Sequence, residues 1–272
     1  MTNRVEAQID LRRIVQNYRY IQGLLRPGCR VMSVVKADAY GHGAAAVCRA
    51  LAAAGNADFA VACVEEAVEL RKSGVAGSIL ILGVTDCARA GTLAEYDLIQ
   101  TVDSLAYAEE LAGHGPCRVH LKIDTGMSRL GFYCHAEHDL ERTAAEIARI
   151  FTHTGLRVEG IFTHFAESDV TDSAFTKEQF FLFTALTGML AARGFDCGLR
   201  HCCNSAAILN NPEMQLDMVR AGIILYGLLP SPAMRAPSLA PAMRLVSRVA
   251  AVREIRAGDC VSYGCAFRAP RD

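Results

Sequence analysis

A lysine that ends a short apolar run is the first residue of this chain whose setting could support chemistry. Residues 31–35 (VMSVV) lie between a proline-glycine pair and a polar, glycine-containing segment, which is typical of a strand buried on both faces. Lys36 follows at the carboxyl end, where α/β folds place ligand-contacting residues. A partly desolvated lysine there can attack a carbonyl as a neutral amine and form a Schiff base. The alternative is a lysine whose stem packs along the strand end and whose amine reaches solvent.

Polar side chains follow other apolar runs of the chain in the same way. Because the carboxyl ends of parallel strands meet at one face of a barrel, we expect these side chains to lie together. In chain order they are Tyr40; Lys122, Asp124 and Arg129 in HLKIDTGMSRLGF; His164 in GIFTHF; Asn204 and Ser205 in RHCCNSAA; and Arg220 and Gly222 in MVRAGIILYG.

Eight strand-like runs alternate with helical stretches. This alternation favours a parallel sheet, and eight strands favour closure into a (β/α)8 TIM-like barrel, an α/β fold. No G-x-G-x-x-G follows the first strand, which disfavours a dinucleotide-binding fold. The strand-like runs are residues 31–35, 59–62, 79–82, 98–102, 118–123, 158–163, 198–201 and 215–219.

The pattern also predicts how the chain divides into domains. Residues 11–230 are expected to form the barrel, 231–243 a proline-rich linker, and 244–272 the start of a β-rich domain, with which an N-terminal strand in 1–10 associates. Within the β-rich part we expect strands at 244–255 and 260–267 around the turn 256–259.

Composition excludes several classes of protein. Of the 272 residues, 51% are hydrophobic and 21% charged, which permits a large core, and a net charge of −1 suggests neither nucleic acid nor an anionic membrane as partner. We expect no signal peptide and no membrane span. Eleven scattered cysteines without a CxxC pair predict neither a disulfide framework nor a metal site, so we expect a reduced, cytoplasmic protein.

The string VVKADAYGHG around Lys36 resembles the cofactor-lysine motif of the alanine racemases, which are pyridoxal-phosphate enzymes of fold type III. HLKIDTGMSRLG, THF, NSAA and MVRAGIILYG resemble further motifs of that family in its order and spacing, and the resemblance spans residues 5–267. It implies an isomerase that binds pyridoxal 5′-phosphate through Lys36 and converts a small amino acid, most simply L-alanine to D-alanine for peptidoglycan.

The resemblance also implies which residues hold the cofactor. Tyr40, Ser205 and the Gly222-Ile223 backbone match the family's phosphate contacts, with Asn204 nearby, and His164 matches the histidine against the pyridine face. The alternatives are helix capping by the Asn204 or Ser205 side chain, a plain turn at Gly222, and a structural histidine.

Arg220 matches the residue that faces the pyridine nitrogen, and His201 is expected to orient it through a hydrogen bond. A guanidinium does not readily give up a proton, so the ring stays a weaker electron sink, which favours racemisation over transamination. Arg129 matches the arginine that orients the cofactor's phenolic oxygen and the substrate carboxylate. Lys122 matches a lysine that is often carbamylated in the family; the alternative is an ordinary lysine paired with Asp124.

Racemisation needs a base on each face of the substrate, and Lys36 supplies one. Tyr263, in VSYGCAF, matches the second base, which in the family enters the other subunit's active site. The resemblance therefore implies a head-to-tail homodimer with shared sites; the alternative is a structural tyrosine on a strand.

Two strings of the family, glycine-tyrosine-alanine-aspartate and cysteine-methionine-aspartate, do not occur here. We therefore expect the chain to end within the C-terminal β-domain. Because those strings line the substrate pocket, a serine or broad-spectrum racemase, or a cofactor-binding remnant with little activity, remain alternatives.

Overall fold

The computed structural model describes residues 4–153 and 155–272. These residues form two compact units, each described here by itself. Residues 9–242 make up the barrel unit, and residues 4–8 with 243–272 make up the second, smaller unit.

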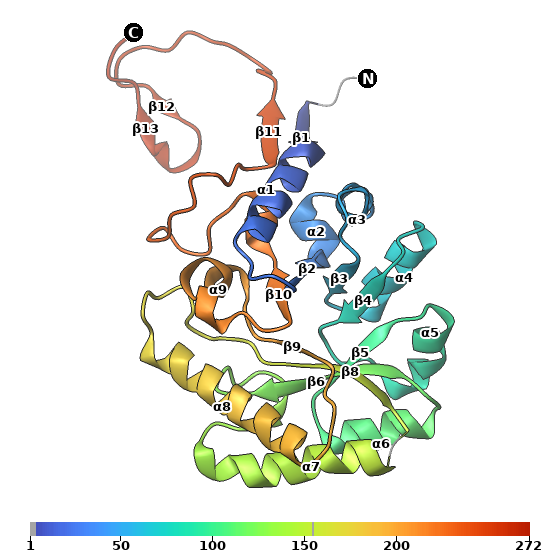
Figure 1. Cartoon of the computed structure of the whole chain (residues 1–272). Coiled ribbons are helices and arrows are strands. Elements are labelled where there is room, and N and C mark those ends of the chain that lie inside the picture. Colours follow the sequence, from blue (N-terminus) through green and yellow to red (C-terminus); the bar gives the residue numbers. More distant parts are fainter. Residues whose placement is uncertain (1–3, 154) are drawn as a thin grey trace. The chain divides into compact units, whose positions relative to one another are not determined.

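The barrel unit contains a closed ring of eight parallel strands (Figure 1). Each strand pairs in parallel with the next, and the pairing of the last strand with the first closes the ring. The fold class expected from the alternating pattern is therefore confirmed. The strands are β2 (Arg30–Val34), β3 (Asp58–Val61), β4 (Ser78–Ile81), β5 (Ile99–Val102), β6 (Arg118–Asp124), β8 (Arg157–Phe162), β9 (Leu199–His201) and β10 (Met218–Ala221), while β7 (Phe132–Tyr133) pairs outside the ring with β6.

Helices connect successive strands and pack against the outside of the ring (Figure 1). Polar side chains cap the N-termini of several helices. The Asp10 side chain accepts a hydrogen bond from the Arg12 amide at the start of the helix 11–23, and the Ser104 side chain accepts one from the Tyr107 amide at the start of the helix 105–113. The α-helices are α1 (Leu11–Gly23), α2 (Lys36–Gly41), α3 (Ala44–Ala53), α4 (Val64–Lys72), α5 (Ala90–Glu95), α6 (Leu105–Gly113), α7 (Leu140–His153), α8 (Ala174–Ala192) and α9 (Ser205–Asn210), and a short 3-10 helix, η4 (Ile223–Tyr226), follows β10.

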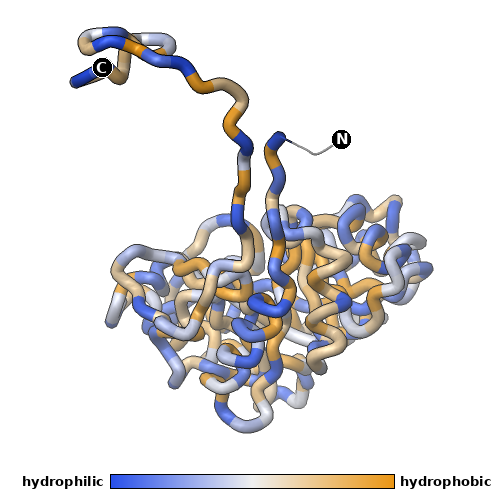
Figure 2. The backbone as a smooth tube through the Cα atoms, turned by 90° about the horizontal axis from the view of Figure 1, so that it is seen from above, coloured by the Kyte–Doolittle hydropathy of each residue, from blue (hydrophilic) through white to orange (hydrophobic). Residues whose placement is uncertain are grey.

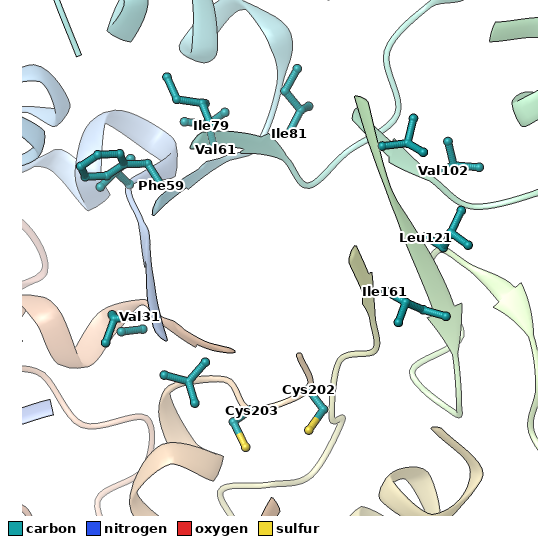
Figure 3. Packing of buried hydrophobic residues seen from close by; sticks show 14 of the residues in the cluster. Val31, Phe59, Val61, Ile79, Ile81, Val102, Leu121, Ile161, Cys202 and Cys203 are labelled. Atoms are coloured by element: carbon teal, nitrogen blue, oxygen red, sulfur yellow. The ribbon is translucent and has the colours of Figure 1, made fainter. Parts of the chain in front are cut away.

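The strands bury side chains on both faces, which explains their continuous apolar runs. Val31, Phe59 and Ile161 point outward and pack under the helices, as Figure 3 shows. Their neighbours Met32 and Phe162 belong to a separate cluster that fills the interior of the ring. Alternate residues of one strand therefore serve two cores, and the polar residues that interrupt the inner set are those available for chemistry.

The segment 231–242, within the predicted linker, is fixed to the barrel unit by backbone contacts. The Asn17 side chain on α1 donates to the carbonyls of Leu225 and Ala240 and accepts from the Ala240 amide. Gly227 has φ +80°, and a Cβ there would lie 1.9 Å from the Ala240 oxygen, so the close approach requires glycine.

The smaller unit contains β1 (Val5–Ile9) beside β11 (Met243–Ser247), and a short antiparallel hairpin of β12 (Cys260–Val261) and β13 (Phe267–Arg268). The predicted strands at 244–255 and 260–267 are wrong in extent, because β11 ends at Ser247 and the hairpin lies wholly within 260–268. Val249 and Val252 are 81% and 90% exposed, so within the smaller unit this apolar run has no surface to pack on and gains nothing from strand geometry. In Figure 2 hydrophobic and hydrophilic residues alternate along this unit, whereas in the barrel unit hydrophobic stretches gather inside.

No helix of the described residues is long and apolar enough to cross a membrane.

Candidate active site

A cavity of about 520 Å³ opens at the carboxyl ends of the barrel strands. Its volume lies within the usual range for small-molecule sites. The structure brings most of the predicted site residues together here, while His201 lies beneath the cavity and Tyr263 belongs to the other unit. The predicted residues that line the cavity are Lys36, Tyr40, Lys122, Arg129, His164, Asn204, Ser205, Arg220, Gly222 and Ile223.

Lys36 begins a left-handed helical turn, residues 36–41, which we call the Lys36 turn. Within this turn, the four residues from Ala37 to Tyr40 have φ between 51° and 55° and ψ between 37° and 52°. None of them is glycine, and each such residue costs roughly 1–2 kcal/mol relative to right-handed geometry. The sequence does not predict this left-handed turn, because alanine has no preference for the left-handed region.

Contacts at the far end of the Lys36 turn hold it in place. The Asp38 carboxylate accepts from the Ala44 amide at 2.6 Å and so begins α3. His42 Nδ1 lies 3.0 Å from the Ala39 carbonyl, which assigns the ring proton to Nδ1. The Tyr40 ring packs 5.2 Å from that of Tyr226, and burial raises the pKa of Tyr40, so its phenol is a neutral donor in the cavity.

Ser205 and Gly222 form the side of the cavity next to Tyr40. The Gly222 amide donates to Ser205 Oγ at 3.0 Å, and a Cβ on Gly222 would lie 3.1 Å from the Tyr40 hydroxyl oxygen. Asn204 caps α9 by accepting from the amides of Ala206 and Ala207, which is the capping alternative that the sequence left open for it. Two hydroxyls and the start of η4 thus surround a space that any larger residue at 222 would fill.

Arg220 lines the cavity from a buried position, and both terminal nitrogens of its guanidinium are hydrogen-bonded. It donates to the carbonyls of Thr163 and Cys202, to His201 Nδ1 at 2.9 Å, and to His164 Nδ1 at 3.2 Å. Burial lowers the pKa of Arg220 to about 10, so it remains a cation at neutral pH. Burial also holds the pKa of His164 well below its usual value, with the charge of Arg220 as a further cause, and the His164 ring is neutral.

His120, a further buried histidine that the sequence analysis missed, extends this hydrogen-bond network. Because Arg220 donates to His201 Nδ1, the His201 proton lies on Nε2 and faces His120 Nδ1 at 3.0 Å. Burial lowers the pKa of His120 to about 3, so both rings are neutral. A Cβ on Gly160 would lie 2.5 Å from the His120 ring, so this glycine provides room for it. The signal in the sequence is the period of two in HLK, which places His120 and Lys122 on one face of β6.

Lys122 projects into the same interior without a carboxylate partner among the described ion pairs. Its Nζ donates to the Ile123 carbonyl at 2.7 Å and lies 5.6 Å from the Phe162 ring centre. Burial, followed by the charge of Arg220, lowers the pKa of Lys122 to about 7, so much of the amine is neutral at physiological pH. The alternative of an ordinary pair with Asp124 is therefore not what the structure contains.

Asp124 instead orders the loop that carries Arg129. Its Oδ1 accepts from the amides of residues 126, 127 and 128 at 2.9–3.1 Å, and its Oδ2 lies 3.2 Å from His135 Nε2. Arg129 follows on this loop and reaches the cavity from an exposed position.

Tyr263 lies in the smaller unit, on the turn between β12 and β13. Its side chain is 98% exposed. Ser262, directly before it, has φ 60° and ψ −168°, a conformation that non-glycine residues rarely adopt.

The cavity suits an anionic aromatic ligand such as pyridoxal phosphate. Among the residues that line it, the basic groups of Lys36, Lys122, Arg129 and Arg220 outnumber the single carboxylate of Asp169. The space beside Gly222 has the hydroxyl and backbone donors that a phosphate requires. The residues present therefore fit that cofactor.

Known proteins resemble the chain along almost its entire length. The family model for the N-terminal domain of alanine racemase matches residues 9–230. The alanine racemase of Desulforamulus reducens is 41% identical over 279 residues, covering 100% of this chain and 74% of the relative. That of Desulfosudis oleivorans is 40% identical over 275 residues, covering 97% and 70%.

Solved structures agree with the sequence comparisons. The alanine racemase of the D-cycloserine producer Streptomyces lavendulae superposes with a TM-score of 0.91 at 32% identity, covering 100% of this chain and 72% of that one. The enzyme from Streptomyces coelicolor has a TM-score of 0.90 at 35% identity, covering 98% and 72%.

Proposed function

Since this chain belongs to the alanine racemase family of pyridoxal-phosphate-dependent isomerases, we propose that it interconverts L- and D-alanine by a two-base mechanism that uses Lys36 and Tyr263. The observation that carries the proposal is that Lys36 and Arg220 line one cavity together with Ser205 and Gly222, whose hydroxyl and backbone form what we call the phosphate cradle.

Pyridoxal phosphate, when bound, supplies an electron-withdrawing ring that makes the α-proton of an amino acid easier to remove. Its phosphate would be held by Tyr40, Ser205, Gly222 and Ile223. Asn204 would support this phosphate cradle by capping α9, the helix that begins at Ser205. His164 would lie against the ring face, and we assign Arg220 to the ring nitrogen. These assignments are supported by the position of each residue at the cavity.

The chain's own groups then divide the proton transfers. Lys36 takes or returns a proton at the alanine Cα on one face, and the Tyr263 hydroxyl does so on the other. Arg220 stays protonated at neutral pH, so it would donate a hydrogen bond to the ring nitrogen without giving up its own proton. The ring would then withdraw electrons less strongly, which favours return of the α-proton to Cα. Arg129 would orient the substrate carboxylate through its planar donors.

Lys122 is proposed to be carbamylated and to orient Arg129. Support comes from its lowered pKa, because a neutral amine is the form that adds to carbon dioxide, and from the absence of a carboxylate partner among the described ion pairs. Mass spectrometry of the intact chain in bicarbonate buffer tests this.

We further propose a head-to-tail homodimer in which Tyr263 acts in the partner's site. The exposure of Tyr263 supports this. Mixing Lys36→Ala with Tyr263→Phe, each inactive alone, should restore about a quarter of wild-type activity, since half of randomly paired dimers are mixed and each contains one intact site. No recovery on mixing would refute the shared site.

The product is proposed to be D-alanine for peptidoglycan, made in the cytoplasm. All eleven cysteines are free thiols, in keeping with a reducing compartment. We also propose that residues 11–230 are the cofactor-binding domain and that 1–10 and 244–272 belong to a β-rich domain.

The deciding experiment follows the loss of optical activity of L-alanine, and separately of D-alanine, by the chain loaded with pyridoxal phosphate. Both should decay to the racemate, and borohydride treatment should label Lys36. Cofactor binding without turnover would refute the catalytic proposal. In a bacterial strain that requires D-alanine, expression of the chain should restore growth.

A further inference from the structure

Glu66 joins the ends of two neighbouring barrel strands at the cavity side. It lies half-buried in the first turn of α4. Its Oε1 accepts from the Ala37 amide at 2.7 Å, and its Oε2 accepts from the Ala62 amide at 2.7 Å. Ala62 directly follows β3, and Ala37 directly follows Lys36.

The two hydrogen bonds have different reach. The bond to Ala62 spans four residues and satisfies a backbone group next to the start of α4, as a helix cap does. The bond to Ala37 spans 29 residues and connects α4 to the Lys36 turn. Helix capping therefore accounts for one oxygen of the carboxylate and leaves the other unexplained.

The bond to Ala37 acts on the peptide group that Lys36 shares with Ala37. Fixing the plane of that peptide fixes ψ of Lys36, and with it the direction in which the lysine side chain leaves the backbone. The contacts of Asp38 and His42 hold the far end of the Lys36 turn, whereas Glu66 holds the end next to the amine.

The hydrogen bond from the Ala37 amide to Glu66 matters because the backbone of the Lys36 turn is strained. Four successive non-glycine residues in left-handed geometry together cost several kcal/mol, so the Lys36 turn persists only if surrounding contacts stabilise it. A hydrogen bond to a carboxylate is among the stronger single contacts available for this.

We propose that Glu66 is a positioning residue for racemisation, which holds the first peptide of the Lys36 turn and so aims the Lys36 amine into the cavity. The proposal rests on the role of Lys36 proposed above.

Glu66→Gln is the test variant, with Glu65→Gln as its matched control. Glutamine keeps the size of the side chain but has one acceptor oxygen, so one of the two amides would face an NH2 donor. Glu65 neighbours Glu66 on the same helix, is exposed, and pairs with Arg89. We expect Glu66→Gln to lower kcat by about tenfold to a hundredfold, with KM for alanine changed by less than about threefold, because the amine is misaimed while substrate contacts remain. Glu65→Gln should match the wild type.

A second measurement uses the chain without cofactor. By NMR hydrogen exchange, the Ala37 amide should be protected in the wild type and in Glu65→Gln, and should exchange at least about tenfold faster in Glu66→Gln. Reductive trapping of pyridoxal phosphate at Lys36 should also slow in Glu66→Gln alone. If the wild-type Ala37 amide exchanges as fast as an unstructured one, the proposal is overturned, whether or not any variant folds.

The outcomes separate this proposal from the proposed function. Wild-type racemisation by a folded Glu66→Gln chain, with unchanged trapping at Lys36, would overturn the role of Glu66 and leave the racemase intact. A wild-type chain that traps the cofactor at Lys36 but does not racemise alanine would refute the proposed function, while trapping and exchange would still decide whether Glu66 aims the amine.

Discussion

The two proposed bases come from regions of opposite character. Lys36 belongs to the barrel unit, in which Phe59, Val61 and Ile79 are fully buried. Tyr263 belongs to the smaller unit, in which Leu245 is 72% exposed and Tyr263 itself 98%. Packing within the barrel unit can fix Lys36, whereas contacts within the smaller unit do little to fix Tyr263. The proposed homodimer would account for this difference, because Lys36 is held by its own fold and Tyr263 would be held by the partner subunit.

The largest effect should come from the preorganised base. Lys36→Ala should lower kcat by at least about 10⁴-fold, because it removes both the cofactor attachment and a proton acceptor. The measurement is the decay of optical rotation of L-alanine. The matched control is Lys72→Ala on the exposed face of α4, which should remain fully active. A Lys36→Ala enzyme with undiminished turnover would contradict the role of Lys36 as a catalytic base.

The base in the smaller unit should give an asymmetric effect. We assign the α-hydrogen of L-alanine to Tyr263 and that of D-alanine to Lys36. In Tyr263→Phe, exchange of the α-hydrogen of L-alanine with deuterated solvent should therefore slow by about 10²–10⁴-fold, while exchange from D-alanine should persist. Proton NMR in deuterium oxide measures both rates. Tyr133→Phe, which changes a half-exposed barrel tyrosine, should alter neither. Equal slowing for both enantiomers would contradict the assignment of separate faces.

Stability should separate the two regions next. Phe59→Ala should lower the free energy of unfolding by about 3–5 kcal/mol, because it opens a cavity beneath the helices. Leu245→Ala should change it by less than about 0.5 kcal/mol, because the leucine is largely exposed. Urea unfolding followed by circular dichroism gives both values. A large loss in Leu245→Ala would show that the smaller unit packs in solution against something that buries this leucine.

A pH dependence of stability is expected inside the barrel. Burial lowers the pKa of Lys122 from the ordinary lysine value of 10.5 to about 7, so between these values the unfolded chain binds a proton that the folded chain does not. From pH 7 toward pH 10 the wild type should therefore gain stability relative to Lys122→Met, with a slope approaching about 1.4 kcal/mol per pH unit, and the difference should level off below pH 7.

The comparison uses chemical unfolding in buffers free of carbon dioxide. Parallel pH profiles of the two proteins would mean that Lys122 is not desolvated. Added bicarbonate should stabilise the wild type further and leave Lys122→Met unchanged if the amine is carbamylated, because the carbamate forms on the folded chain.

Much of this molecule could be predicted locally. The eight strands were placed within a few residues because each is an apolar run of a length typical of strands, and the cavity residues were found because they follow those runs directly. The identification of an amino-acid racemase of pyridoxal-phosphate type is likewise confirmed, since the motifs that carry it are contiguous strings.

The errors and omissions have a common cause. The strand predicted at 244–255 stops at Ser247 because strand geometry depends on a surface to pack against. His120 was missed because its role arises from His201, 81 residues away. The alternative pairing of Lys122 with Asp124 does not form, because Asp124 is occupied by its own loop.

The sequence by itself determined the barrel, the order of its strands and the set of polar side chains at their ends, because hydrophobic periodicity and strand-end chemistry are properties of neighbouring residues. Only the tertiary structure decided the left-handed turn after Lys36, the reach of Glu66 across 29 residues to hold it, and the desolvation of Lys122. These depend on groups brought together by chain closure, and a backbone conformation that alanine does not favour forms only where such groups offset its strain.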